Sequence, residues 1–135
     1  MTRNRTRGVT VLVVDDDATT RETFQHMLRA EGYAVRAESS VETGLASAVD
    51  ETPDVILLDL HMPLAGGLEC LRRLRAQPEC AAIPVAIVTG DYFIDDVIAE
   101  ELRQHGAQIY FKPVWEEDLR RIVHESLSRY PARTH

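Results

Sequence analysis

The chain has 135 residues, of which 44% are hydrophobic and 27% charged, proportions that suit one soluble globular domain with a substantial core. A formal net charge of −7 argues against a nucleic-acid-binding surface, because such a surface needs clustered lysine and arginine. No apolar run approaches the roughly 18 residues that span a membrane, and no signal peptide is recognisable, so we expect a cytoplasmic protein without membrane contact.

Five short apolar runs, rich in β-branched residues, predict buried strands. The expected strands span residues 9–14, 33–39, 54–60, 83–90 and 107–111. After each run, apolar side chains recur at helical spacing and predict an amphipathic helix. The residues that carry these helices are Phe24 and Leu28, Val41 and Leu45, Leu71 and Leu74, Ile98 and Leu102, and Leu119 and Ile122. Because parallel strands need crossover connections, this alternation predicts an α/β fold with a doubly wound parallel sheet and helices on both faces.

The two ends of the chain are expected to lie outside this fold. Arginines alternate with polar residues before the first apolar run, and we interpret residues 1–8 as a flexible basic tail, with contact to an acidic partner as the alternative. Residues 9–129 are expected to form the single domain, and a short tail follows at 130–135.

Polar side chains follow the ends of four predicted strands. They are Asp15, Asp16 and Asp17 after the first strand, Asp59 in the third, Thr89 in the fourth and Lys112 after the fifth. In an open parallel sheet, ligands bind beyond the carboxyl ends of the strands. These side chains are therefore expected to converge at one edge of the sheet.

Together, the converging groups are typical of a site that accepts a phosphoryl group with the help of a metal ion. Carboxylates from two strands repel one another unless a hard cation lies between them, and ligands that are all oxygen suit Mg²⁺. A lysine and a hydroxyl supply the point charge and the hydrogen-bond donor that a phosphoryl group needs. A carboxylate can itself attack a phosphoryl group and form an aspartyl phosphate.

Simpler interpretations exist for each residue taken alone. A role as the N-cap of the first helix is enough to explain Asp17, and either Asp95 or Asp96 can cap the fourth helix. Capping does not explain Asp59, because no helix begins directly after it. The lysine and the threonine can be an ordinary surface residue and an ordinary strand residue. Their occurrence in order at successive strand ends nevertheless favours a common site.

The segments VLVVDDD, VILLDLHMP, VAIVTG and YFKP resemble, in this order, four segments of the receiver domains of two-component response regulators, the CheY-like family. These are the acidic pair, the phosphoacceptor loop, the Thr/Ser strand and the Lys-Pro strand end. The likeness covers residues 9–129. It implies a flavodoxin-like (βα)5 fold, with the five parallel strands in the order 2-1-3-4-5.

The resemblance also implies a metal site. Asp59 would be the phosphorylated residue, and Asp16 and Asp59 would bind Mg²⁺ directly, together with the backbone carbonyl of His61. Asp15 would act mainly through a metal-bound water. The His61 side chain is expected at the rim, with proton donation or metal ligation as the alternative, since Mg²⁺ prefers oxygen.

The resemblance further implies which residues bind the phosphoryl group. Lys112 would pair with the carboxylate and then with the phosphoryl group, and the Thr89 hydroxyl would bond a phosphoryl oxygen. The Lys112–Pro113 peptide would be cis, a conformation that costs little only before proline.

By the same resemblance, a sensor histidine kinase, a histidine phosphotransfer protein or a small donor such as acetyl phosphate would transfer its phosphoryl group to Asp59. Thr89 and the loop after the fourth strand would then move and bias a two-state equilibrium. A downstream protein, or a second copy in a homodimer, would bind the face formed by the fourth helix, fifth strand and fifth helix. The chain would be a stand-alone receiver or part of a longer regulator, and it would catalyse only its own phosphorylation and dephosphorylation.

The sequence departs from the family in the fifth strand. An aromatic switch residue usually lies three positions before the lysine, where Ile109 stands here. Because the segment is also one residue shorter than is common, Tyr110 is a displaced candidate for that role. Strict alternation puts Ile109 and Phe111 on one face and Tyr110 on the other, so the sequence leaves open which side Tyr110 takes.

Further departures surround the phosphoryl site. Gly90 stands where alanine is usual, which should leave the site more open. His61 and Asp91 lie two residues after Asp59 and Thr89, where the family tunes dephosphorylation. We therefore expect an altered phosphoryl lifetime, without a direction.

Three further aromatic residues and both cysteines can be interpreted from the sequence. Tyr92 and Phe93 either face a partner or pack partly against the domain. Trp115 is expected to pack beneath the last helix, with docking as the alternative. Cys70 and Cys80 match neither a disulfide framework nor a metal-ligand spacing, so we expect reduced thiols.

Other functions fit parts of the sequence. A small Mg²⁺-dependent phosphohydrolase also uses an aspartyl nucleophile after a strand, but it needs an acid/base aspartate two residues later, where His61 stands. A flavodoxin-like cofactor binder needs a first loop rich in Ser, Thr and Gly to hold a phosphate, and the acids found there would repel one.

Overall fold

The computed structural model describes residues 8–62 and 66–129, so the two expected tails lie outside the described residues apart from Gly8. The strands are β1 (Thr10–Val14), β2 (Ala34–Glu38), β3 (Val55–Leu58), β4 (Val85–Thr89) and β5 (Gln108–Phe111). The α-helices are α1 (Ala18–Ala30), α2 (Val41–Asp50), α3 (Gly66–Ala76), α4 (Asp96–Gln104) and α5 (Glu116–Arg129). A short 3-10 helix, η1 (Pro78–Cys80), follows α3 and was not expected from the sequence.

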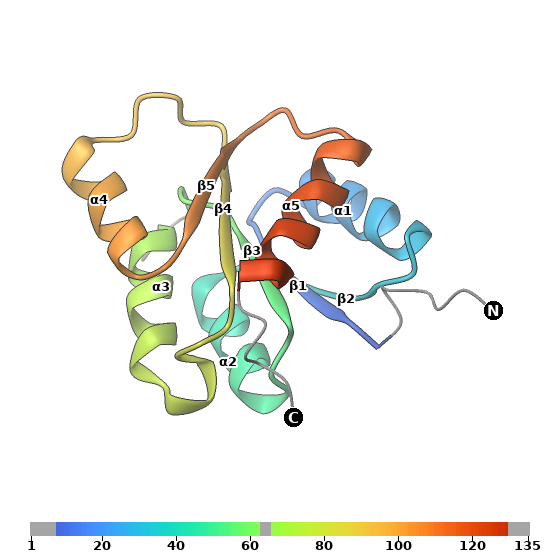
Figure 1. Cartoon of the computed structure of the whole chain (residues 1–135), viewed down its shortest axis with the longest axis horizontal. Coiled ribbons are helices and arrows are strands. Elements are labelled where there is room, and N and C mark those ends of the chain that lie inside the picture. The colour runs from blue at the N-terminus through green and yellow to red at the C-terminus, as the bar shows by residue number, and fades with distance from the viewer. Residues whose placement is uncertain (1–7, 63–65, 130–135) are drawn as a thin grey trace.

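All strands join one five-stranded sheet in the order β2-β1-β3-β4-β5, and every neighbouring pair is parallel (Figure 1). This confirms the predicted doubly wound α/β fold and its strand order. Strand β3 ends at Leu58, earlier than the predicted end at residue 60, because the backbone leaves the sheet where the acidic site begins.

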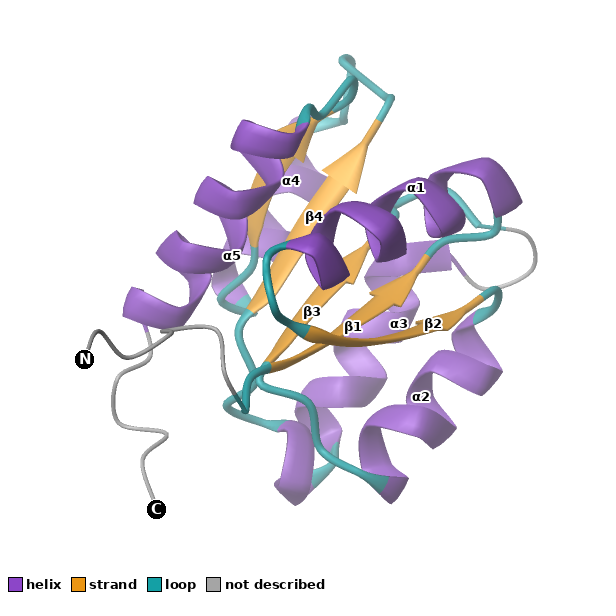
Figure 2. Cartoon of the chain, turned by 90° about the vertical axis from the view of Figure 1, so that its right-hand side faces the viewer, coloured by secondary structure: helices purple, strands orange, loops and turns teal. Residues whose placement is uncertain are grey.

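Side chains of the central strands divide the core into two layers, since successive residues of a strand point to opposite faces. Leu12 and Leu58 pack with residues of α2, α3 and α4 on one face. Val13 and Leu57 pack with residues of α1 and α5 on the other. Figure 2 shows α1 and α5 in front of the sheet and α2, α3 and α4 behind it. Each such buried aliphatic side chain stabilises the fold by roughly 1.5–3 kcal/mol.

The sheet register brings the strand ends together at one edge. Val14 lies opposite Leu58, so the next residues of β1 and β3 leave the sheet side by side. The backbone N–H of Asp59 donates to the Val14 carbonyl at 2.9 Å, and that of Lys112 donates to the Thr89 carbonyl at 2.8 Å. Main-chain pairing therefore positions the predicted site residues.

Two predicted caps are present at helix starts. Asp17 is the N-cap of α1, and its carboxylate accepts the Thr20 N–H at 2.9 Å. The Thr20 hydroxyl also donates to this carboxylate, and the two hydrogen bonds lower the pKa of Asp17. Of the two candidates at α4, Asp95 is the cap, accepting the Val97 N–H at 2.8 Å. Asp17 thus differs from its neighbours in serving the helix.

The packing predicted for Trp115 is wrong, because its side chain is 67% exposed. Its backbone N–H donates to the Asp118 carboxylate at 2.9 Å, directly before α5. The inward-facing stripe of that helix begins only at Leu119, which is fully buried. Trp115 therefore lies ahead of the turn that packs on the sheet.

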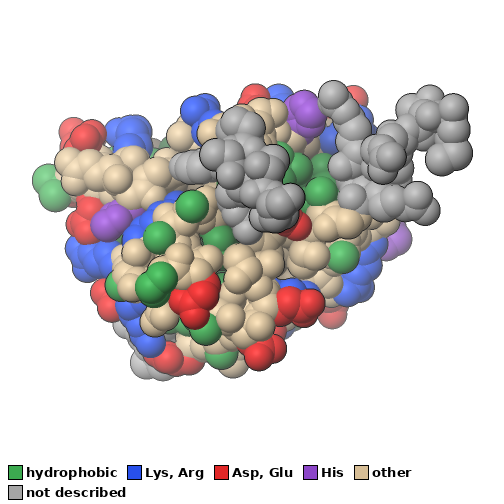
Figure 3. Space-filling view, turned by 60° about the horizontal axis from the view of Figure 1, so that its bottom comes forward, with side chains coloured by type: hydrophobic (Ala, Val, Ile, Leu, Met, Phe, Trp, Pro, Cys, Tyr) green, Lys and Arg blue, Asp and Glu red, His purple; other side chains and the backbone are tan. Residues whose placement is uncertain are grey.

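At the bottom of the molecule as drawn in Figure 1, the surface carries hydrophobic side chains only in small groups among charged and other atoms (Figure 3). Within the described ranges, every helix is too short or too polar to cross a membrane.

Candidate functional site

An acidic cluster forms where β1 and β3 end. Asp15, Asp16 and Asp59 each offer one carboxylate oxygen, and these oxygens lie within 4.8 Å of one another. Asp15 and Asp59 are buried, with 3% and 8% of their surface exposed, whereas Asp16 is exposed. A set of donors made only of carboxylate oxygens, with one side open to solvent, fits a hard divalent cation such as Mg²⁺. The convergence predicted for these three residues is thus present.

Asp15 is already engaged on both of its oxygens. The Lys112 Nζ donates to its Oδ2 at 3.0 Å, and the Asp17 backbone N–H donates to its Oδ1 at 2.9 Å. Within residues 8–62 and 66–129, no side chain or backbone group donates a hydrogen bond to the Asp16 carboxylate. Asp16 is therefore the carboxylate most available to a cation, followed by Asp59, which accepts the backbone N–H of His61.

Asp59 carries an unfavourable charge when no cation is bound. Burial raises its pKa to about 6, and the nearby Asp15 carboxylate adds to the rise while Lys112 opposes it. A cation between the carboxylates would favour the charged form, which is the nucleophilic one. The arrangement thus supplies a carboxylate whose charge depends on what neutralises the cluster.

Thr89 lies at the end of β4 and is fully buried. Its hydroxyl oxygen accepts the backbone N–H of Asp91 at 3.1 Å. The Asp91 carboxylate in turn contacts His61 Nε2 at 2.6 Å and accepts the Phe93 N–H at 2.9 Å. The bond to His61 lowers the pKa of Asp91. These contacts tie the loop after β4 both to β4 itself and to the loop after β3.

His61 lies at the rim of the site, as expected from the sequence. Its side chain is 65% exposed and pairs with Asp91, and it is not part of the acidic cluster. Its backbone N–H bonds to Asp59 and opposes the rise in the pKa of that carboxyl. The metal-ligand interpretation of the imidazole is therefore not supported, and the role of the backbone carbonyl stays a prediction.

Gly67 was not singled out by the sequence, although it fixes the backbone beside Asp59. Its N–H donates to the Leu60 carbonyl at 2.7 Å. A Cβ at this position would lie 2.4 Å from the Asp59 carbonyl oxygen, a distance that no side chain can occupy. The preceding Gly66 has φ +80°, which also favours glycine. The adjacent pair of glycines at the start of α3 was the available signal.

Gly90 faces open space, because a Cβ there would meet nothing within 4 Å. That Gly90 makes the phosphoryl site more open stays a prediction. The Lys112–Pro113 peptide is cis, as the resemblance implied.

Tyr110 lies on the opposite face of β5 from Ile109, as alternation requires. Ile109 packs against the core shared with α4, whereas Tyr110 packs against the core shared with α5. The Tyr110 hydroxyl donates to Glu125 at 2.9 Å. Burial and the neighbouring Glu125 raise its pKa to about 12. Tyr110 thus belongs to the α5 side of the sheet.

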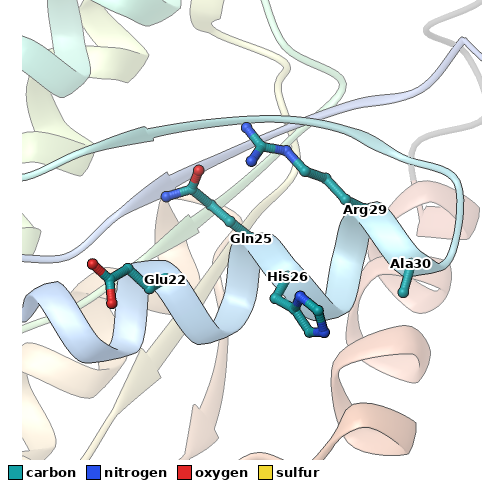
Figure 4. A pocket seen from close by; sticks show the side chains of 5 residues that line it. All are labelled: Glu22, Gln25, His26, Arg29 and Ala30. Atoms are coloured by element: carbon teal, nitrogen blue, oxygen red, sulfur yellow. The ribbon is translucent and has the colours of Figure 1, made fainter.

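A surface hollow along α1 contains none of the clustered carboxylates. Glu22, Gln25, His26, Arg29 and Ala30 line it, and all five belong to α1 (Figure 4). None of them belongs to the acidic cluster, which lies at the strand ends. The strand-end cluster therefore remains the candidate site.

Comparisons with known proteins identify the family of the chain. The profile of the response regulator receiver domain matches residues 11–124. Protein PilH of Pseudomonas aeruginosa is 37% identical over 120 residues, which cover 87% of this chain and 97% of PilH. The polar-differentiation response regulator DivK of Brucella ovis is 34% identical over 106 residues, covering 77% of this chain and 84% of DivK.

Among solved structures, a CheY-like response regulator receiver domain protein of Methanospirillum hungatei superposes with a TM-score of 0.84. It is 25% identical, and the match covers 93% of this chain and 98% of that one. With the acidic cluster, the strand order and these matches in agreement, the chain belongs to the response regulator receiver domain family of two-component signalling proteins.

Proposed function

We propose that this chain is the phosphoacceptor of a two-component system or phosphorelay, and that Asp59 receives the phosphoryl group. The observation that carries the proposal is the buried Asp59 carboxylate within a cluster of three carboxylates, with Lys112 3.0 Å from Asp15. A sensor histidine kinase or a histidine phosphotransfer protein is the proposed donor. Its P–N bond would break as an Asp59 oxygen forms the new P–O bond.

The proposed cofactor is Mg²⁺. Asp16 and Asp59 would bind it directly together with the His61 backbone carbonyl, and Asp15 would bind it through water. The oxygen-only donor set and the open side at Asp16 support this assignment. When bound, the ion would neutralise charge on the carboxylates and on the incoming phosphoryl oxygens.

The remaining steps belong to side chains of this chain. Asp59 attacks phosphorus, and Lys112 leaves Asp15 to pair with a phosphoryl oxygen, where its charge offsets the developing negative charge. Thr89 then donates its hydroxyl hydrogen to another phosphoryl oxygen. Catalysis of this kind is mostly positioning, so the chain would act on itself and on no separate substrate.

Output would pass through protein contacts. We propose that phosphorylation changes binding at the face of α4, β5 and α5, either to a downstream protein or to a second copy. The exposed apolar side chains Val97, Phe111 and Trp115 on or beside this face support its use in binding. We also propose a cytoplasmic location, supported by the free thiols of Cys70 and Cys80.

The proposal is tested by incubation with acetyl phosphate and Mg²⁺, followed by intact mass measurement and mapping of the modified residue. We expect one phosphoryl adduct on Asp59, absent in Asp59→Asn and absent when EDTA is present. Asp17→Asn is the matched control, because it changes a neighbouring aspartate while keeping a side chain that can cap α1.

Absence of an adduct in the unmodified protein with every phosphodonor tried would contradict the proposal. Steady turnover of a small phosphate ester would favour the phosphohydrolase instead.

A further inference from the structure

The segment Asp91–Phe93, which follows β4, is anchored to both sides of the phosphoryl site. On the β4 side, the Asp91 N–H donates to the Thr89 hydroxyl oxygen at 3.1 Å. Across the site, the Asp91 carboxylate contacts His61 at 2.6 Å. The segment is therefore one hydrogen bond away from the residue proposed to bind the phosphoryl oxygen.

Tyr92 extends this anchoring to β5. Its ring stacks on Phe111, with ring centroids 5.5 Å apart and an angle of 24° between the planes. Its hydroxyl donates to the backbone carbonyl of Lys112. A single stacked pair of rings is a weak contact, so it holds the loop on the strand without locking it.

The two phosphoryl-binding residues thus reach Tyr92 by separate routes. Thr89 acts on the segment through Asp91, and Lys112 acts on it through its own carbonyl. If Thr89 turns its hydroxyl toward a phosphoryl group, the oxygen that accepts the Asp91 N–H moves with it. If Lys112 leaves Asp15, the end of β5 that is hydrogen-bonded to Tyr92 is displaced in the same event.

The outer side of Tyr92 is an exposed apolar surface. Tyr92 and Phe93 are 58% and 90% exposed, and Val97 and Phe111 are also exposed. Six of the seven exposed large hydrophobic side chains of the described residues lie between positions 92 and 115. Movement of Tyr92 would therefore alter a surface that is already suited to contact with a protein.

We infer that Tyr92 is the positioning residue that couples the phosphoryl site to this surface, by clamping the loop after β4 onto Phe111 and Lys112. The inference rests on the proposed phosphorylation of Asp59. The two preceding residues of β5 do not provide the same link. Ile109 is aliphatic, and Tyr110 packs toward α5 and bonds Glu125. Occupancy of the site releases the clamp, and the surface around Phe93 and Val97 changes.

The test uses the full chain labelled with ¹⁵N, saturated with Mg²⁺ and beryllium fluoride, a mimic of the phosphoryl group that is not transferred. Amide shift changes are measured at Leu60, next to the site, and at Phe93, Val97 and Phe111 on the surface. In Tyr92→Ala we expect the surface changes to fall below about one third of their size in the unmodified protein, while Leu60 changes as before. Tyr92→Phe, which keeps the stack and loses the hydroxyl, should give an intermediate response.

Phe93→Ala is the matched control, because it removes a neighbouring aromatic ring that is almost fully exposed. Its effect should stay local, with Val97 and Phe111 responding as in the unmodified protein. Surface changes of undiminished size in both Tyr92 variants would overturn the inference. Intact mass after acetyl phosphate treatment separates the two proposals: no adduct on Asp59 in the unmodified chain refutes the phosphoacceptor function, whereas a normal adduct with unaltered coupling refutes only the role of Tyr92.

Discussion

Asp59 links the chemistry of the site to the stability of the domain. Its pKa rises from 3.8 to about 6, chiefly through burial and then through the Asp15 carboxylate. Between these values the native state binds more protons than the unfolded chain, so the free energy of unfolding falls as the pH rises. The charged Asp59 carboxylate is therefore kept at a cost to the metal-free fold above pH 6.

Asp59→Asn should remove this cost. In EDTA at pH 7.5 we expect the variant to be more stable than the unmodified protein by up to about 3 kcal/mol, and the difference should disappear below about pH 4. Urea denaturation at the two pH values measures it. The exposed Asp50→Asn on α2 is the control and should show no such gain. Equal stability of Asp59→Asn and the unmodified protein at pH 7.5 would contradict the expectation.

Gly67 permits the close approach of α3 to the backbone of Asp59. Gly67→Ala would put a Cβ 2.4 Å from the Asp59 carbonyl oxygen, so we expect a loss of about 1–3 kcal/mol together with slower phosphorylation by acetyl phosphate. The loss would occur although alanine favours a helix. Gly90→Ala is the control, since its Cβ meets nothing within 4 Å. Equal unfolding midpoints for the two variants would show that the α3 contact is not tight.

At the scale of elements, helix α4 begins directly beside the site. Its N-cap Asp95 accepts the Val97 N–H, so the cap holds the first turn of the helix that carries the exposed Val97. Helix α3 is joined to α4 on the surface by the pair of Arg72 and Glu101, with Nε and Oε2 2.6 Å apart. The start and the body of α4 are thus held by different kinds of contact.

Asp95→Ala should destabilise the domain by about 1 kcal/mol, the usual effect of losing a helix N-cap. Hydrogen exchange should be faster in the first turn of α4 and unchanged in α5. Asp96→Asn, which alters a charge in the same turn and leaves the cap, should have a smaller effect. If the two variants exchange alike, the hydrogen bond of Asp95 does not hold the turn.

In the molecule as a whole, a cation bound at the cluster would join the ends of β1 and β3, two neighbouring strands inside the sheet. A ligand that binds only the native state stabilises it by RT ln(1 + [L]/Kd), about 2.7 kcal/mol at one hundred times Kd. We therefore expect MgCl₂ to raise the melting temperature of the unmodified protein and to have little effect on Asp16→Asn. The same shift with NaCl at equal ionic strength would attribute the effect to salt.

The fold class and the composition of the site follow from the pattern of residues along the chain. Strand and helix periodicity and the residues at strand ends are local features, so they can be read from short segments such as VLVVDDD and YFKP. The N-cap Asp17 is equally local, because its partner Thr20 lies within the same turn. The parallel order then requires the carboxyl ends of β1 and β3 to lie side by side.

The pairing of groups across the site depends on how the whole chain packs. Lys112 bonds Asp15 across 97 positions of the chain, and Tyr92 reaches Phe111 and Lys112 from another loop. The side taken by Tyr110 and the exposure of Trp115 depend on how α5 packs against the sheet. Such contacts form between segments that are distant in the chain, where each residue has several possible partners, and packing of the complete core selects one of them.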